Sequence, residues 1–101
     1  MKVVKLSHPN YEYDVHSLVK AFYAEDQVTV ITPETKPEKL AELEPQVSLE
    51  IELAETGAKI RVGEEDFLWD AETENLADGY KNGLKRFLYR TLSKVTGQKL
   101  P

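Results

Sequence analysis

The sequence contains no cysteine, and this absence removes several classes of function at once. Disulfide scaffolds, thiol catalysis, thiolate-bound zinc and iron–sulfur clusters all need cysteine side chains, so this chain cannot supply them. The five glycines are scattered and form no glycine-rich phosphate loop. No stretch approaches the roughly 20 apolar residues of a membrane span, and "MKVVKLSHPN" lacks the apolar core of a signal peptide. We therefore expect a cytoplasmic protein with no membrane partner.

Positive charge is also in short supply. Lys and Arg number 13 against 18 Asp and Glu over 101 residues, which gives a net charge of −5. Binders of nucleic acids and of membrane surfaces need a cationic footprint, so the overall balance disfavours both kinds of partner. The length and the 41% share of apolar residues fit one domain with one modest core.

The first third of the chain predicts a strand, a helix and a second strand. The strands are expected over residues 2–7 and 27–32, and the helix over about residues 11–24, with Asn10 or Asp14 as its N-cap. One face of this helix is apolar and consists of Val15, Leu18, Val19 and Phe22. A β-α-β unit of this kind usually joins parallel strands through a right-handed crossover.

The middle of the chain predicts an antiparallel meander. Residues 33–45 hold three prolines and are expected to form a connection with about one helical turn at residues 38–43. Apolar and polar residues then alternate on both sides of a turn at Thr56-Gly57, which predicts a hairpin with one buried face and one wet face. Glutamates of the first strand should pair with Lys59 and Arg61 across the wet face. A third antiparallel strand is expected at residues 67–71.

A basic helix closes the chain at about residues 76–96, and Gly97 stands where a left-handed helix stop belongs. Its apolar stripe consists of Leu76, Tyr80, Leu84, Phe87, Leu88, Leu92 and Val95. The elements together predict an α+β fold: a mixed sheet of four or five strands, with both helices packed on one face.

The search for catalytic or metal-binding groups gives little. His8 and His16 lack the spacing and company of metal ligands, so a structural or solvent-exposed role is favoured. The acidic residues belong to several separate elements, and nothing in their order brings two of them together in an apolar pocket. They are best interpreted as a solvated surface.

The last helix offers the one candidate interface. Arg86, Arg90 and Lys94 form an i, i+4, i+8 row, with Lys85 and Tyr89 beside it. Such a row could hold phosphate or carboxylate groups, although a solvated face that suits the helix dipole is favoured in a net acidic chain. Two glycines inside the same helix predict that another backbone, of the sheet or of a further domain, approaches closely there. The candidate residues are Gly79, Gly83, Lys85, Arg86, Tyr89, Arg90 and Lys94.

The segment "KNGLKRFLYRTLSKVTGQKLP" resembles one found in radical-SAM proteins of the oxygen-independent coproporphyrinogen III oxidase type, often called coproporphyrinogen dehydrogenases. In that family a helix of the form Lys-x-x-Leu-Lys-Arg-x-Leu-Tyr-x-x-Leu ends at Thr-Gly and is followed by Leu-Pro. The matching positions are Lys81, Leu84, Lys85, Arg86, Leu88, Tyr89, Leu92, Thr96, Gly97, Leu100 and Pro101. The resemblance is specific over about 20 residues and looser before them.

The resemblance implies an accessory role. Family members look like enzymes of haem biosynthesis that oxidatively decarboxylate two propionates, using S-adenosylmethionine and a [4Fe–4S] cluster on a Cys-x-x-x-Cys-x-x-Cys motif. This chain has no cysteine, so no catalytic or cofactor-binding residue of the family can be assigned to it. The expectation is that residues 1–97 are the N-terminal domain of a longer enzyme and residues 98–101 begin the linker to its radical-SAM domain. The alternative is a stand-alone module that binds RNA or an acidic partner through the basic helix.

Overall fold

The computed structural model describes residues 2–7, 15–71 and 79–99, which contain a five-stranded sheet of order β2-β1-β3-β4-β5. Its strands are β1 (Lys2–Leu6), β2 (Val28–Ile31), β3 (Val47–Ala54), β4 (Gly57–Val62) and β5 (Glu65–Asp70). The helices are α1 (Val15–Tyr23), α2 (Pro37–Leu43) and α3 (Gly79–Thr96), with short 3-10 turns η1 (Glu25–Gln27) and η2 (Glu44–Gln46). The mixed sheet and the closing helix confirm the predicted α+β class.

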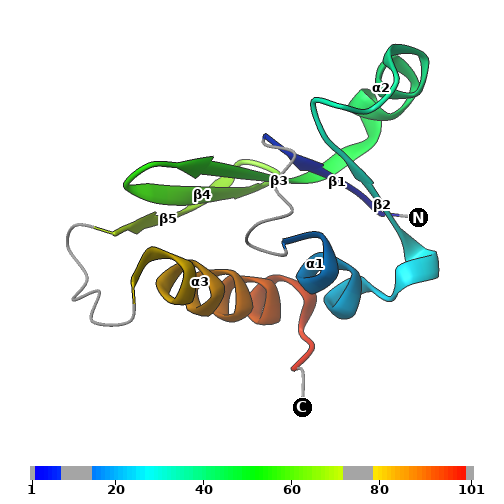
Figure 1. Cartoon of the computed structure of the whole chain (residues 1–101). Helices are drawn as coiled ribbons and strands as arrows, with labels where there is room; N and C mark the ends of the chain where they lie inside the picture. Colours follow the sequence, from blue (N-terminus) through cyan, green and yellow to red (C-terminus); the bar gives the residue numbers. More distant parts are fainter. Residues whose placement is uncertain (1, 8–14, 72–78, 100–101) are drawn as a thin grey trace.

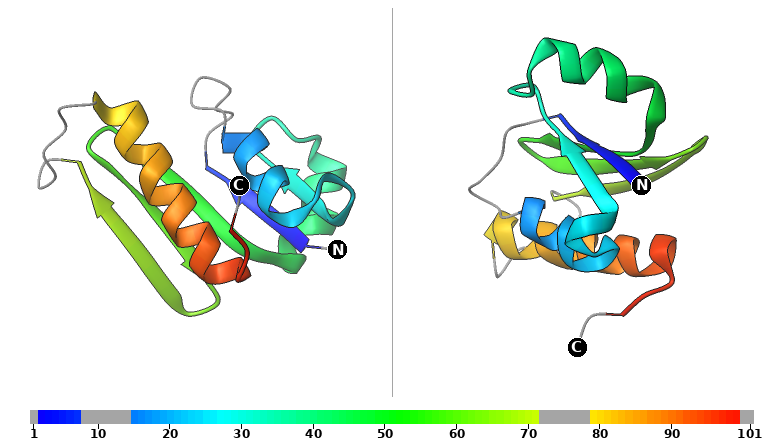
Figure 2. Two further views of the ribbon diagram at one scale, coloured as in Figure 1. Left: turned by 90° about the horizontal axis from the view of Figure 1, so that it is seen from below. Right: turned by 90° about the vertical axis from the view of Figure 1, so that its right-hand side faces the viewer.

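Strand β1 lies between two parallel partners. It pairs with β2 on one side and with β3 on the other, and β4 and β5 then continue the sheet as antiparallel strands. The chain leaves β1 through α1 to reach β2, and it returns past β1 through α2 to reach β3. Right-handed crossovers that run in opposite directions place their helices on opposite faces of a sheet. Figures 1 and 2 show this arrangement, with α1 and α3 on one face and α2 on the other.

The main core fills the space between the sheet and the pair formed by α1 and α3. The predicted stripes of both helices are confirmed: their buried members are Val15, Val19, Phe22, Leu84, Phe87, Leu88 and Leu92. From the sheet they meet Val4 and Leu6 of β1, among others. Leu76 and the two expected N-caps, Asn10 and Asp14, lie outside the described residues.

The predicted hairpin is confirmed as β3 and β4. Ala54 pairs with Gly57, so the turn consists of residues 55 and 56, and Gly57 already belongs to β4. The third antiparallel strand is also present, but it covers Glu65–Asp70 rather than residues 67–71. Its first two residues are charged, and an exposed edge strand accepts such residues without cost to the core.

The segment between β2 and β3 is more ordered than its prolines suggest. Helix α2 covers Pro37–Leu43, where a connection with about one turn was expected. Pro37 stands in the first turn, where its missing N–H is not needed for a helical hydrogen bond. None of the residues of α2 is fully buried, so its sequence lacks the apolar stripe that reveals α1 and α3.

The cross-strand ion pairs of the wet face are confirmed in part. The Lys59 Nζ lies 3.3 Å from the Glu52 carboxylate, as expected. Arg61 instead pairs with Asp66 of β5, with 2.8 Å between Nε and Oδ1. The register explains the difference, because Arg61 stands directly opposite both Glu50 and Asp66.

Candidate functional site

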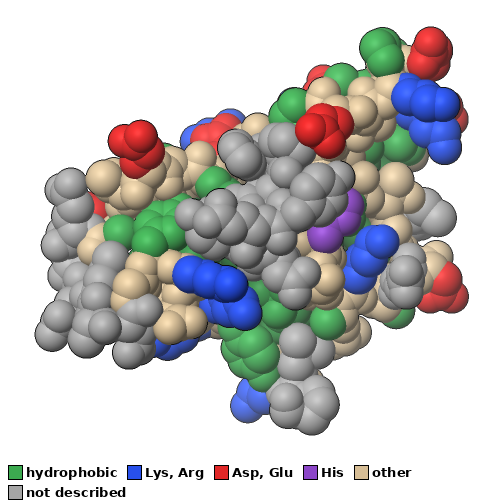
Figure 3. Space-filling view, in the orientation of Figure 1, with side chains coloured by type: hydrophobic (Ala, Val, Ile, Leu, Met, Phe, Trp, Pro, Cys, Tyr) green, Lys and Arg blue, Asp and Glu red, His purple; other side chains and the backbone are tan. Residues whose placement is uncertain are grey.

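The predicted basic surface lies on the exposed side of α3. The side chains of Arg86, Arg90 and Lys94 are all exposed. Successive members of this row stand about 6 Å apart along the helix axis, because each residue advances the helix by 1.5 Å. Figure 3 draws Lys and Arg side chains at the level of α3, whereas most of the Asp and Glu side chains in that view lie higher, over the hairpin and α2.

The side chains of the candidate surface form a band around the helix rather than a flat patch. They are Lys85, Arg86, Tyr89, Arg90 and Lys94. Lys94 lies towards β5, where its Nζ is 5.3 Å from the ring centroid of Phe67. Tyr89 lies towards α1, where its ring meets Phe22 edge-on at a centroid distance of 5.5 Å. Lys85 precedes Lys94 by two and a half helical turns, which puts these two side chains on opposite flanks of α3.

Charge is strongly segregated between this helix and the rest of the chain. Residues 79–101 contain six Lys or Arg and no Asp or Glu, which gives +6. Residues 1–78 contain seven Lys or Arg and all 18 acidic residues, which gives −11. A net acidic protein thus carries one strongly basic element.

The helix dipole accounts for only part of this basic surface. Its effect is confined to the first and last turns, and Lys94 is the one basic residue of the last turn. Lys81 lies near the opposite end, where the dipole opposes a positive charge. Three like-charged i, i+4 pairs also weaken the helix, by about 0.2–0.5 kcal/mol each. These pairs are Lys81–Lys85, Arg86–Arg90 and Arg90–Lys94.

The two glycines of α3 have different surroundings. Gly83 is buried on the side that carries Leu84 and Phe87, as expected for a residue packed against the rest of the fold. Gly79 is exposed, has a φ of 84°, and has no described atom within 4 Å of the place a Cβ would occupy. Close packing of Gly79 against the sheet, one of the two predicted possibilities, is therefore wrong, and its contact with a further domain stays a prediction.

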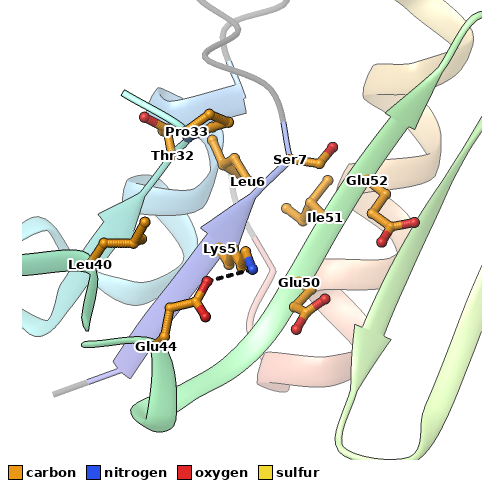
Figure 4. A pocket seen from close by; sticks show the side chains of 10 residues that line it. All are labelled: Lys5, Leu6, Ser7, Thr32, Pro33, Leu40, Glu44, Glu50, Ile51 and Glu52. Carbon is orange, nitrogen blue, oxygen red and sulfur yellow. Dashed lines mark hydrogen bonds and ion pairs between the residues drawn. The ribbon is translucent and has the colours of Figure 1, made fainter. Parts of the chain in front are cut away.

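A cavity of about 390 Å³ lies on the opposite face of the sheet, below α2. Its walls come from residues 5–7 at the end of β1, residues 32 and 33 after β2, residues 50–52 of β3, Leu40 of α2 and Glu44 of η2. Figure 4 shows these side chains around the line between β1 and β3. The connection after β1 leads to β2 on one side of β1, whereas the connection after β2 leads back to β3 on its other side. Open α/β sheets commonly hold their ligands at the carboxyl ends of the strands at such a point.

The cavity offers ion pairing and hydrogen bonding. The Lys5 Nζ donates a hydrogen bond of 2.6 Å to Glu44 Oε1, which ties η2 to β1. This bond is the main reason that the pKa of Lys5 is raised. Burial opposes it with the next largest effect, and the charges of Glu44, Glu50 and Glu52 add to the rise. The Ser7 hydroxyl accepts a hydrogen bond of 3.2 Å from the backbone N–H of Leu53. The residues that line the cavity include no histidine.

Sequence reasoning did not find this cavity. Its residues come from five separate segments, and each of them looks like an ordinary strand or turn residue in its own context. The available signal was topological: two crossovers that leave a central first strand in opposite directions create a crevice at its carboxyl end.

His16 takes no part in either surface. It lies on α1 and is partly buried. Burial lowers the pKa of its imidazole, and the positive charge of Lys20, one turn further along the helix, lowers it again. A structural role, as expected for this histidine, agrees with that position. His8 lies outside the described residues.

The fold defines the chain as a mixed α+β domain with strand order β2-β1-β3-β4-β5. In comparisons with known proteins, no family model, no curated protein and no solved structure matches the chain.

The residues present do not fit an iron–sulfur cluster. The chain has no thiolate to offer, and the described residues contain no group of three or more His, Asp or Glu able to hold a metal ion. No described helix has the length and apolar character needed to cross a membrane.

Proposed function

We propose that this chain is a non-catalytic accessory domain of a larger radical-SAM enzyme of the coproporphyrinogen dehydrogenase type. The proposal rests on the resemblance of α3 and the residues after it to the family segment. The Lys-x-x-Leu-Lys-Arg-x-Leu-Tyr-x-x-Leu form falls wholly within α3, from Lys81 to Leu92. Three residues separate Leu92 from the Thr-Gly of the family form, in which Gly97 has a left-handed φ of 72°.

One observation carries most of the weight. The leucines of the motif, Leu84, Leu88 and Leu92, are completely buried, so packing alone accounts for them in any fold of this type. Lys81, Lys85, Arg86 and Tyr89 are exposed, and the core does not require them. Their agreement with the family form is the part of the resemblance that the fold does not explain.

The division of labour follows from the chemistry of the cofactor. A [4Fe–4S] cluster that chelates S-adenosylmethionine needs cysteine thiolates, and a chain without cysteine leaves cluster and radical chemistry to another domain of the same polypeptide. The accessory domain would contact that domain through α3, and the enzyme would act in the cytoplasm on a porphyrinogen.

The test uses the native reading frame. We expect the residues after Pro101 to begin with Trp-Gly and to lead to a Cys-x-x-x-Cys-x-x-Cys motif. The whole protein, produced without oxygen, should bind iron and decarboxylate coproporphyrinogen III in the presence of S-adenosylmethionine. A form that lacks residues 1–101 should retain its iron but lose turnover or thermal stability.

Two results would contradict the proposal. A reading frame without the cysteine motif would show that the resemblance has no functional content. Equal turnover and equal thermal stability of the whole and shortened proteins would exclude an accessory role for residues 1–101.

A further inference from the structure

We propose that the exposed side of α3 is a docking surface for an acidic protein segment whose carboxylates repeat about every 6 Å. The inference uses the same helix as the domain contact proposed above, but it is argued from this chain alone and its test does not depend on the proposed function. Its basis is a helix that carries five positive charges and no negative one, next to a body, residues 1–78, of net charge −11. The helix dipole explains Lys94 but not the charges at Lys81, Lys85, Arg86 and Arg90.

The spacing of the charges sets the form of the partner. Arg86, Arg90 and Lys94 span about 12 Å along α3, with about 6 Å between neighbours. Carboxylates at i, i+4 on a partner helix repeat at the same distance, and alternate residues of an extended strand repeat at about 6.6–6.8 Å. An acidic segment of either form brings one carboxylate to each cation of the row.

Tyr89 supplies an anchor beside the charges. It is one of two large hydrophobic side chains in the described residues that remain exposed, at 38%. Its ring is held edge-on by Phe22 of α1, so little side-chain freedom is lost when a partner covers it. Tyrosine and arginine together are typical of the residues that dominate binding energy at protein interfaces.

Charge distribution favours a protein segment over a nucleic acid. A nucleic acid extends well beyond one helix, and the body of −11 in a molecule with an isoelectric point near 5.0 would repel its flanking phosphates. A short acidic segment meets α3 only. At physiological salt the field of the body is screened beyond about 8 Å.

Packing also disfavours a membrane surface as the partner. Helices that lie on membranes insert an apolar face between lipids. In α3 that face is already occupied, because Leu84, Leu88 and Leu92 are completely buried against α1 and the sheet.

The test compares two charge reversals of equal size. The probe is a fluorescent peptide of about ten residues with glutamate at every fourth position, long enough to cover the row. Arg90→Glu reverses the centre of the row, and the matched control Lys39→Glu makes the same change on exposed α2, across the sheet. At about 50 mM salt we expect the wild type to bind the peptide, Arg90→Glu to lose about tenfold in affinity, and Lys39→Glu to lose less than about twofold. Arg90→Gln should fall between the wild type and Arg90→Glu.

Each other outcome overturns the inference. Absence of peptide binding at about 50 mM salt would show that α3 is not a docking surface for acidic segments. Equal losses in Arg90→Glu and Lys39→Glu would reduce it to an effect of net charge. Tighter binding of an oligouridylate with the same number of charges would assign the surface to nucleic acid. Circular dichroism of both variants checks that the fold is intact, which exposed positions should preserve.

Discussion

At Gly57 the backbones of β4 and β5 approach so closely that no side chain fits between them. A Cβ at this position would overlap the backbone carbonyl oxygen of Trp69 in the neighbouring strand. A backbone atom inside a sheet cannot move aside as a flexible side chain does. The position therefore requires glycine for lack of space.

We expect Gly57→Ala to lower the free energy of unfolding by about 1–3 kcal/mol, because the two strands must separate to admit the methyl group. Thr56→Ala, in the exposed turn just before it, is the control and should cost far less. Urea unfolding followed by tryptophan fluorescence measures both, since Trp69 belongs to the affected strand. Equal stability of Gly57→Ala and the wild type would mean that the strands are not packed so closely.

His16 makes the stability of the fold depend on pH. Burial, assisted by Lys20, lowers the pKa of its imidazole below 6.5 in the folded chain. The unfolded chain therefore binds the proton first as the pH falls, and the stability present above pH 6.5 decreases as the pH falls through the folded pKa.

We expect an NMR titration of the His16 ring to give a midpoint below 6.5. Lys20→Gln should raise this midpoint slightly, because it removes the second cause of the shift. His16→Gln should make the unfolding free energy less sensitive to pH between about 7 and 5. A midpoint above 6.5 in the wild type would contradict the assigned burial.

At the scale of the elements, the helices are unequal in what they contribute to stability. Leu88 of α3 is completely buried between α1 and the sheet. Leu40, in contrast, is only partly buried, and α2 has no fully buried residue. The side of the sheet that carries α1 and α3 therefore holds most of the hydrophobic stabilisation.

We expect Leu88→Ala to destabilise the fold by about 2–5 kcal/mol, because it leaves a cavity in the core. Leu40→Ala removes the same atoms from a partly exposed site and should cost less than half as much. Thermal or urea unfolding of both variants tests the comparison. Equal losses would show that α2 is as firmly packed as α3.

The elements also show what the sequence could and could not predict. The β-α-β opening, the hairpin and α3 were predictable because each buries one regular face, and period-two or helical alternation follows directly from that. Helix α2 was predicted only as about one helical turn at residues 38–43, because it buries no side chain fully and therefore has no such pattern. The start of β5 was placed two residues late because Glu65 and Asp66 are exposed on an edge strand.

The candidate surfaces divide in the same way. The row on α3 was predictable because its members lie on one helix at a fixed spacing. The cavity below α2 was not, because it depends on β1 and β3 being neighbours although more than 40 residues separate them in the chain. A single sequence contains no local signal for such a pairing.

At the scale of the whole molecule, the fold is organised around β1. It is the first element of the chain, yet it has a strand on each side and a layer of helix on each face. Val4 is completely buried there, and Val3 beside it exposes only 1% of its surface.

We expect Val4→Asp to prevent folding at room temperature. A carboxylate without a partner in this position costs several kcal/mol, against a total stability of about 5–15 kcal/mol for a domain. Lys2→Asp, an exposed change in the same strand, should leave a folded protein. Far-ultraviolet circular dichroism distinguishes the outcomes, and a folded Val4→Asp would show that β1 is less central than its pairing indicates.

The central place of β1 has a consequence for the order in which the protein is made. The strand leaves the ribosome before either of its partners, and β3 begins only at Val47. At about 5–20 residues per second, its apolar side chains wait for roughly 2–10 seconds before the sheet can close on both sides of them. During that interval the nascent chain presents "VVKL" to whatever binds exposed apolar segments. A chaperone thus has time to bind the exposed β1 segment while the chain is being synthesised.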